Sequence, residues 1–255
     1  MAQILVNEYN YANNPSGSFS YNTQYVGGAP TVGIIIYNNG NGPGASQDSN
    51  YVTAIAAARS AGIKALGYVY TSYTSRALGT VEADIDSWYS FYTLDGIHID
   101  NVNAYTGANF TYYQSLYNYV KGKDPTRNFV AMNCGFLPDE SYMTISDTIS
   151  MFEYGYLPIV GLTRSFMGDF SSQVGGWFTK YPSSKLFATV FNIPDIPTMQ
   201  SVVNAIQRAG VGYINVSDQI YPNEYSTPPS SSFWSAAQTA VGQSVGGSTF
   251  GFFSI

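Results

Sequence analysis

Two carboxylic acids end short apolar runs in this sequence. Asp100 closes the run that starts at Gly96, and Glu153 closes the run that starts at Ile149. An unpaired carboxylate is costly to bury, so an acid at the end of a buried strand calls for a partner or a function. Two acids held across one site are what glycoside hydrolysis requires. We therefore expect Asp100 and Glu153 to form a catalytic pair, the alternative being helix-capping or salt-bridged structural acids.

Aromatic residues accompany these acids. Tyr154 follows Glu153 directly, and burial among aromatic rings raises the pKa of a carboxyl group and suits it to proton donation. Aromatic rings also stack on the faces of sugars. Tyr9, Tyr11 and Tyr70 are further candidates for such stacking, although tyrosine is so frequent here that position is the only argument for them.

Other polar residues occupy the ends of expected strands. Glu8 lies on the first of these strands and Asp218 just past the last. They either complete a ring of four carboxylates, or each is a surface residue or a loop cap. Asn38, Asn133 and Asn192 end or follow other strands. Their side-chain amides are candidates to donate hydrogen bonds to substrate hydroxyl groups.

His98 and Asn101 flank Asp100 in the sequence. Side chains alternate along a strand, so His98 is expected on the same side as Asp100 and one layer deeper. A hydrogen-bonded core histidine is the preferred interpretation of that position, rather than a catalyst. Both residues are included among those expected near the substrate.

Composition excludes several classes of site. The net charge is −6, with 16 acidic and 10 basic residues, which argues against a nucleic-acid partner. A single Cys and a single His exclude a disulfide, a cysteine-based metal site and a multi-histidine metal site. The loop 38–44 is glycine-rich but lacks the Gly-Lys-Ser/Thr ending of a phosphate loop, so no cofactor is expected. No secretory signal and no membrane span are visible.

The sequence alternates strand and helix signals. With 255 residues it suits one (β/α)8 barrel of the TIM type, spanning 1–255 with a tail at 246–255. The expected crossover helices are Asn50–Ala61, Val81–Tyr92, Phe110–Lys121, Thr198–Ala209 and Ser232–Val241, whereas Asn10–Pro30 is expected to be a loop. The expected strands are short, rich in Ile, Val, Phe and Tyr, and bounded by Gly, Asn or Pro. They are Ile4–Tyr9, Val32–Tyr37, Ala65–Tyr70, Gly96–Asp100, Phe129–Asn133, Thr148–Phe152, Leu186–Phe191 and Gly212–Val216.

Several short motifs follow one another along the chain. They are Ile36–Gly44, Gly67–Thr71 with Arg76, Gly96–Asp100, Met132–Gly135, Phe152–Glu153, and Asp218 with Pro222–Tyr225 and Pro229. In this order they resemble the spherulin-4-like proteins of glycoside hydrolase family 135. The resemblance implies a β/α barrel that cleaves α-1,4-linked galactosamine or N-acetylgalactosamine polymers at cell surfaces or in biofilm matrix. It also implies that the catalytic acids are an Asp-Glu pair closing the fourth strand, at Asp100 and position 101, and Glu153 closing the sixth.

The sequence departs from this family pattern at three positions. Asn101 stands where the pattern has Glu, Cys134 replaces a usual Pro, and Glu8 occupies an apolar position. Asparagine cannot transfer a proton, so two hypotheses remain open. One is a hydrolase of an amino-sugar polysaccharide that uses Asp100 and Glu153; the other is an inactive barrel that binds carbohydrate or serves as a structural surface protein. Charged residues are only 10% of the chain, and this composition alone motivates a third, a coat or matrix subunit without ligand.

Overall fold

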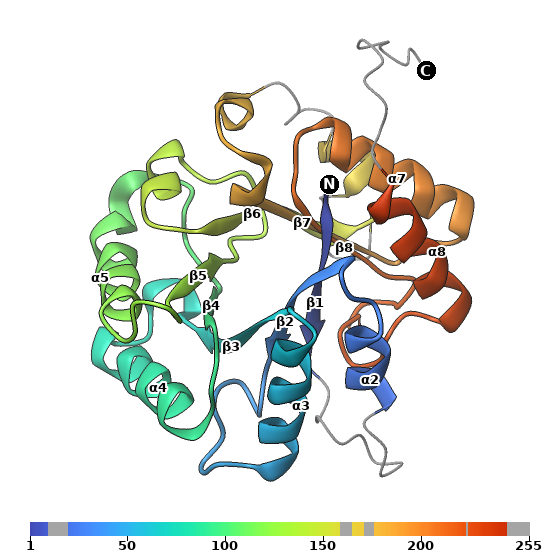
Figure 1. Ribbon diagram of the computed structural model, residues 1–255. Helices are drawn as coiled ribbons and strands as arrows, with labels where there is room; N and C mark the ends of the chain where they lie inside the picture. Colours follow the sequence, from blue (N-terminus) through green and yellow to red (C-terminus); the bar gives the residue numbers. More distant parts are fainter. Residues whose placement is uncertain (10–19, 159–164, 171–175, 223, 244–255) are drawn as a thin grey trace.

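The strand-forming runs pair side by side in chain order and close into a parallel barrel, β1 through β8, with β8 beside β1 (Figure 1). The computed structural model describes residues 1–9, 20–158, 165–170, 176–222 and 224–243. The expected (β/α)8 barrel of the TIM type is confirmed. The strands are β1 Gln3–Glu8, β2 Val32–Tyr37, β3 Lys64–Tyr70, β4 Gly96–Asp100, β5 Phe129–Met132, β6 Thr148–Gly155, β7 Leu186–Phe191 and β8 Tyr213–Val216.

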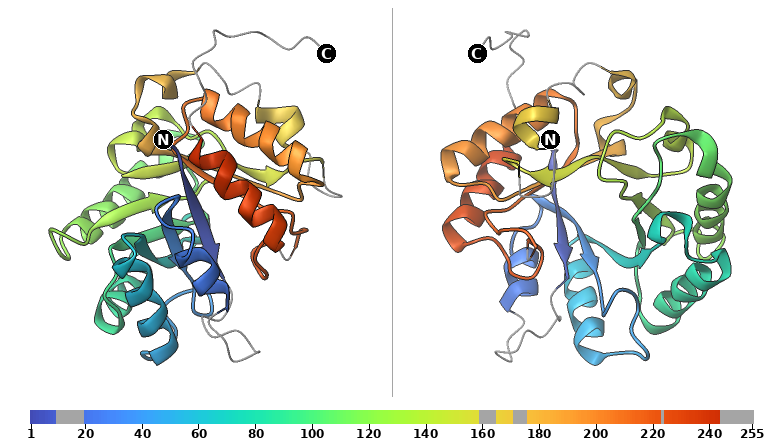
Figure 2. Two further views of the ribbon diagram at one scale, coloured as in Figure 1. Left: turned by 45° about the vertical axis from the view of Figure 1, so that its right-hand side comes forward. Right: turned by 180° about the vertical axis from the view of Figure 1, so that it is seen from behind.

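Helices surround the barrel on its outside (Figure 2). Each expected helix is present, with ends that differ by a few residues. In the part of the chain that the structure describes, no helix is long and apolar enough to cross a membrane. The α-helices are α2 Ser20–Val26, α3 Ser49–Ser60, α4 Leu78–Phe91, α5 Phe110–Lys121, α7 Ile196–Arg208 and α8 Ser231–Gly242. Single-turn helices are η1 Ser72–Thr74, η2 Gly107–Asn109, η3 Glu140–Thr144, η4 Phe166–Phe170, η5 Trp177–Lys180 and η6 Ser183–Lys185.

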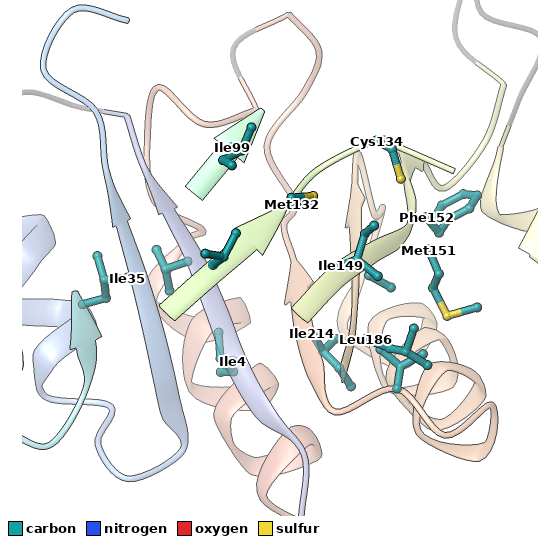
Figure 3. Packing of buried hydrophobic residues seen from close by; sticks show 14 of the residues in the cluster. Ile4, Ile35, Ile99, Met132, Cys134, Ile149, Met151, Phe152, Leu186 and Ile214 are labelled. Carbon is teal, nitrogen blue, oxygen red and sulfur yellow. The ribbon is translucent and has the colours of Figure 1, made fainter. Parts of the chain in front are cut away.

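Alternation along the strands produces two buried layers. On β2, Ile34 and Ile36 face the barrel interior, while Ile35 faces the helices. The inner layer is small and also contains Leu5 and Phe187. The outer layer between strands and helices is much larger, and Figure 3 shows part of it. Both faces of each strand are therefore buried, which explains the nearly continuous apolar runs.

Helix α2 lies within the region that was expected to be a loop, so that expectation is wrong for 20–26. A seven-residue helix has little stability of its own, and tertiary contacts supply it here. The Tyr37 hydroxyl donates to Asn22 Oδ1 at 2.7 Å, and the Asn22 amide donates to the Ala54 carbonyl at 3.4 Å. Tyr25 packs edge-on against Trp234 of α8. Residues 10–19 lie outside the described part.

A β-bulge in β6 decides which way Glu153 points. Pairing with β7 shifts between Ser150 and Phe152, so Met151 is the extra residue. Met151 and Phe152 are both buried in the outer layer (Figure 3). Simple alternation from Ser150 would direct Glu153 towards the helices, and the bulge instead returns it to the barrel interior.

Two pairings of the barrel are shorter than the rest. Strands β1 and β8 align through two residue pairs, and β5 and β6 also through two. Every other pair of neighbours aligns through four to six. We call these two lines the short seams. They divide the barrel into β1–β5 and β6–β8.

Candidate active site

A cavity of about 220 Å³ lies at the carboxyl-terminal end of the barrel. Its wall is formed by the loops that follow β3, β4, β5 and β8 and by the ends of β4, β6 and β7, as expected where all eight parallel strands end on one face. It combines carboxylates, amides and aromatic rings. Its lining residues are Tyr73, Asp100, Asn101, Tyr105, Asn133, Cys134, Gly135, Phe136, Glu153, Tyr154, Phe191, Tyr221 and Glu224.

One amide joins the two predicted catalytic acids. The Asn133 Nδ2 group donates to Asp100 Oδ1 at 3.0 Å and also to Glu153 Oε2. Asn133 is held in turn by its Oδ1, which accepts from the Gly135 N–H at 3.1 Å. Because one nitrogen bonds to both acids, the two acceptor oxygens lie within about 6 Å of each other, twice the length of a hydrogen bond. The sequence-derived pair is therefore a pair in space.

Glu153 has an unusual protonation equilibrium. Burial raises its pKa from 4.5 to about 7, and the negative charge of Asp100 adds to the increase. Hydrogen bonds from Tyr225 and Asn133 act in the opposite direction, because they stabilise the charged form. A carboxyl group of this kind is suited to give up a proton near neutral pH.

Asp100 accepts hydrogen bonds from three side chains. In addition to Asn133, the Tyr68 hydroxyl donates to its Oδ2 at 2.7 Å and the Asn101 amide to the same oxygen at 3.4 Å. Burial and the neighbouring Asp100 raise the pKa of Tyr68 well above its ordinary value, so its hydroxyl remains a donor. Three donors therefore fix the orientation of this carboxylate in the cavity.

A tyrosine cluster lies beside the acids. Tyr9 contacts Tyr68 and Tyr225 edge to face, with ring centroids 5.2 and 5.3 Å apart. The Tyr225 hydroxyl donates to Glu153 Oε1. Through these contacts the loop after β8 is connected to both Asp100 and Glu153.

The loop after β3 has an uncommon backbone. Ser72, Tyr73 and Thr74 all have positive φ, at 48°, 55° and 77°, and Asn101 has φ of 54°. Non-glycine residues in this region cost about 1–3 kcal/mol each unless the surroundings enforce the conformation. Hydrogen bonds supply that enforcement, because the Tyr73 N–H donates to the Asn101 carbonyl at 2.9 Å. The result is that Tyr73 and Asn101 both line the cavity.

Three of the residues expected to bind substrate line the cavity with the acid pair: Asn101, Asn133 and Tyr154. Tyr9 contacts the cluster just described. Tyr70 lies under the Arg76 guanidinium, 4.2 Å from its ring centroid, and does not line the cavity. Tyr11 lies outside the described residues.

The structure gives other expected binding residues local roles away from the cavity. Asn38 Oδ1 accepts from the Gly42 N–H at 3.0 Å and so closes a turn. Asn192 has φ of 56° and its N–H donates to the Gln219 carbonyl. Asp218 accepts from the Ser230 backbone and hydroxyl just before α8, which matches the alternative interpretation of a loop cap.

Glu8 does not join the acid pair. It pairs with Tyr37 across β1 and β2 and has the outward direction of Val6, in the layer between strands and helices. Burial raises the pKa of Tyr25 and Tyr37, which belong to that layer, and the nearby Glu8 carboxylate adds to the increase. The expected ring of four carboxylates is therefore wrong, since Glu8 and Asp218 both lie elsewhere.

His98 is a core residue, as expected, but it is not hydrogen-bonded. It is 1% exposed, and neither ring nitrogen has a hydrogen-bond partner among the described residues. Its ring lies 6.0 Å from that of Tyr68 and 6.2 Å from that of Phe187. Burial lowers its pKa from 6.5 to about 4.

Sequence reasoning missed several members of the site. Glu224 lines the cavity, and Tyr225 and Tyr68 hold the acids. Glu224 and Tyr225 belong to the loop after the last strand. The signal that would have found them is topological, because in a β/α barrel that loop ends on the same face as the acids.

No group of three or more His, Cys, Asp or Glu side chains that would hold a metal ion occurs within the residues described. Cys134 is buried, and burial raises the pKa of its thiol to about 11. The polar side chains that line the cavity carry carboxyl, amide and phenol groups.

The fold that brings the two carboxylates together in its carboxyl-terminal cavity is a closed β/α barrel. Solved structures share this fold. The crystal structure of Aspergillus clavatus Sph3 in complex with GalNAc superposes with a TM-score of 0.77 at 21% identity, covering 94% of this chain and 97% of that one. A class V chitinase from Pseudomonas fluorescens superposes with a TM-score of 0.60 at 10% identity, covering 94% and 100%.

The sequence places the chain more closely. The profile of spherulation-specific family 4 matches residues 3–241, and the chain belongs to this family. Spherulin-4 of Physarum polycephalum is 41% identical over 122 residues, which is 47% of this chain and 36% of that protein. The match thus spans about a third of that relative's length. The resemblance drawn from the motifs is confirmed.

Proposed function

We propose that this protein hydrolyses glycosidic bonds in a galactosamine-type polysaccharide, with Glu153 as proton donor and Asp100 as nucleophile. The observation that carries the proposal is the Asn133 amide, which bonds to both carboxylates in one cavity. Two further facts support it. The chain belongs to spherulation-specific family 4, and its structural relative Sph3 was crystallised with GalNAc. A substrate of this kind would locate the protein at a cell surface or in an extracellular matrix.

The roles follow from the surroundings of each acid. Glu153, with a pKa of about 7, carries a proton at neutral pH and gives it to the leaving glycosidic oxygen. Asp100, oriented by its hydrogen-bond donors, attacks the anomeric carbon and forms a covalent glycosyl ester. Glu153 then removes a proton from water, the water oxygen attacks the same carbon, and Asp100 is released. Both enzyme groups return to their starting state.

Two displacements at one carbon predict retention of anomeric configuration. Retaining enzymes hold their carboxyl groups about 5–5.5 Å apart, and inverting enzymes about 6.5–9.5 Å apart. A shared donor favours the shorter separation, because it limits the nearest oxygens to about 6 Å. The initial product should therefore keep the α configuration of the substrate.

The test measures new reducing ends released from partly deacetylated α-1,4-galactosaminogalactan. We expect the unmodified protein to cleave, whereas Asp100→Asn and Glu153→Gln should each lose activity by about a thousandfold or more, as when a nucleophile or acid is removed. Glu82→Gln, on α4 outside the cavity, is the matched control and should retain full activity. Full activity in either acid variant would remove that residue from the mechanism.

Asn101 supports a second candidate, a barrel that binds carbohydrate without cleaving it. The family pattern has Glu at this position, and the Asn101 amide cannot transfer a proton. The variant Asn101→Glu separates the candidates in the same assay. Cleavage by the unmodified protein establishes the hydrolase, whereas cleavage by Asn101→Glu alone, together with glycan binding by both, establishes the binding protein.

A further inference from the structure

Acidic side chains supply the charge of the cavity. Asp100, Glu153 and Glu224 line it, and no Lys or Arg is among its described lining residues. Like charges gathered at low dielectric repel one another strongly. The pKa of Glu153 reflects this repulsion. Burial raises that pKa most, and the nearby carboxylates of Asp100 and Glu224 raise it further. A neutral sugar would leave this repulsion in place, whereas a cationic sugar would relieve it.

Glu224 differs from the other two acids in its hydrogen bonding. Asp100 and Glu153 accept bonds from Tyr68, Asn133 and Tyr225. Glu224 Oε2, by contrast, is buried and accepts no hydrogen bond from any described group. One of the two carboxylate oxygens of Glu224 is therefore shielded from water and has no hydrogen-bond donor among the described residues. An unsatisfied buried acceptor costs about 1–3 kcal/mol, and a ligand that supplies a donor recovers it.

Neighbouring rings make this part of the cavity suitable for a sugar. Phe191 and Tyr221 both line it, with their rings 6.5 Å apart and nearly parallel, 23° between planes. Tyr221 is 44% exposed and belongs to the same loop as Glu224. Aromatic faces receive the apolar face of a pyranose, which leaves its polar substituents to meet the carboxylates.

We propose that Glu224 is the counter-ion for the protonated 2-amino group of a sugar bound beside the acid pair, and so selects the free amine over the acetamide. This inference rests on the proposed function and specifies its substrate. An ammonium group carries three donors and a positive charge, so it satisfies Glu224 Oε2 and offsets the repulsion among the acids. An acetamide supplies one neutral donor and adds a methyl group. Discrimination of this kind is a difference between two binding free energies.

The test compares two homogeneous oligosaccharides, α-1,4-linked galactosamine and its fully N-acetylated form. The unmodified protein should have the higher kcat/KM on the free amine. Glu224→Gln keeps the size of the side chain but removes its charge, and it should lower kcat/KM on the amine by about 10- to 100-fold, mainly through KM. Activity on the acetylated oligomer should fall by a clearly smaller factor, because only the amine loses its counter-ion. Glu224→Asp should keep part of the preference, and Glu82→Gln all of it.

Two outcomes overturn the inference while the proposed hydrolysis stands. One is an equal loss on both oligosaccharides in Glu224→Gln, which would make Glu224 part of the general machinery. The other is a preference of the unmodified protein for the acetylated oligomer. Melting temperatures of the variants show whether a loss reflects unfolding.

Binding measurements test the recognition of the amine by Glu224 independently of glycosidic cleavage. Galactosamine and N-acetylgalactosamine are titrated into the Glu153→Gln protein by calorimetry, with and without Glu224→Gln. If the protein binds galactosamine more tightly and Glu224→Gln abolishes this preference, the result supports recognition of the amine by Glu224. This holds even if the unmodified protein cleaves neither oligosaccharide and the proposed hydrolysis fails. Equal binding of the two sugars in both proteins overturns it.

Discussion

Glu153 and His98 contribute to stability with opposite dependence on pH. The glutamate has a pKa above its ordinary value and the histidine a pKa below its own, both because of burial. Neutralising one of them should expose the pH dependence of the other. The prediction concerns Glu153→Gln and His98→Phe, each compared with the unmodified protein.

The size and sign of the Glu153 contribution follow from linkage. Between 4.5 and about 7, the folded protein holds a proton on Glu153 that the unfolded chain has lost. The contribution of Glu153 to the free energy of unfolding is therefore fully present below about pH 4.5 and is lost as the pH rises through 7. At 1.36 kcal/mol per pKa unit, the loss is about 3 kcal/mol. Glu153→Gln should escape this loss and should be the more stable protein at about pH 8.

The His98 contribution has the reverse sign. Between about 4 and 6.5, the unfolded chain binds a proton on His98 that the folded protein excludes. The contribution of His98 to the free energy of unfolding is fully present above about pH 6.5, and about 3 kcal/mol of it is lost as the pH decreases through 4. His98→Phe should lack this loss. In the unmodified protein the two contributions largely cancel over the range they share.

Urea denaturation across about pH 4 to 8 measures both differences. The stability of Glu153→Gln minus that of the unmodified protein should rise with pH, and the corresponding difference for His98→Phe should fall. Glu140→Gln, a surface acid with 42% of its side chain exposed, is the control and should give a nearly constant difference. Parallel curves for all four proteins would refute the assignment of these two groups.

Three further predictions concern the site and the barrel. Tyr225→Phe removes a hydrogen bond that stabilises the charged form of Glu153, so the pKa of Glu153 should rise and the alkaline limb of the kcat–pH profile should move up by about one pH unit. An alkaline limb at the same pH in both proteins would contradict this. Asn133→Leu removes the donor shared by both acids and should lower kcat by about 100-fold or more with the fold intact by circular dichroism, whereas near-normal kcat would exclude a catalytic role for the amide. Gly96→Ala would bring a Cβ against a backbone carbonyl of β5, so it should lower the free energy of unfolding by about 3 kcal/mol or more. Gly79→Ala, whose Cβ would meet open space, should leave the free energy of unfolding unchanged, and equal melting temperatures for the two variants would refute the steric argument.

The barrel could be predicted from the sequence because its signals are local. A run such as that of β2 is apolar throughout, and only a strand buried on both faces needs that pattern. Helix α2 could not be predicted, because Asn22 and Tyr25 owe their contacts to α3, β2 and α8. Those partners lie far away in the sequence.

The site was predicted in part for the same reason. Asp100 and Asn133 follow from strand ends alone. The inward direction of Glu153 depends on a bulge that alternation cannot reveal, and the outward direction of Glu8 depends on its register with Tyr37. Glu224 belongs to a loop without a periodic pattern, so only its location in the closed barrel assigns it to the cavity.

The short seams are the two lines along which we expect the barrel to divide into two pieces, because the fewest residues are paired there. A chain cut in the connection between β5 and β6 yields one fragment with β1–β5 and another with β6–β8, and each boundary between them is aligned through only two residue pairs. The first fragment holds Asp100 and Asn133, and the second holds Glu153 and Tyr225. Neither fragment contains a complete acid pair. Sugar release by a mixture of the two would therefore report their reassembly, which makes this barrel a candidate split reporter.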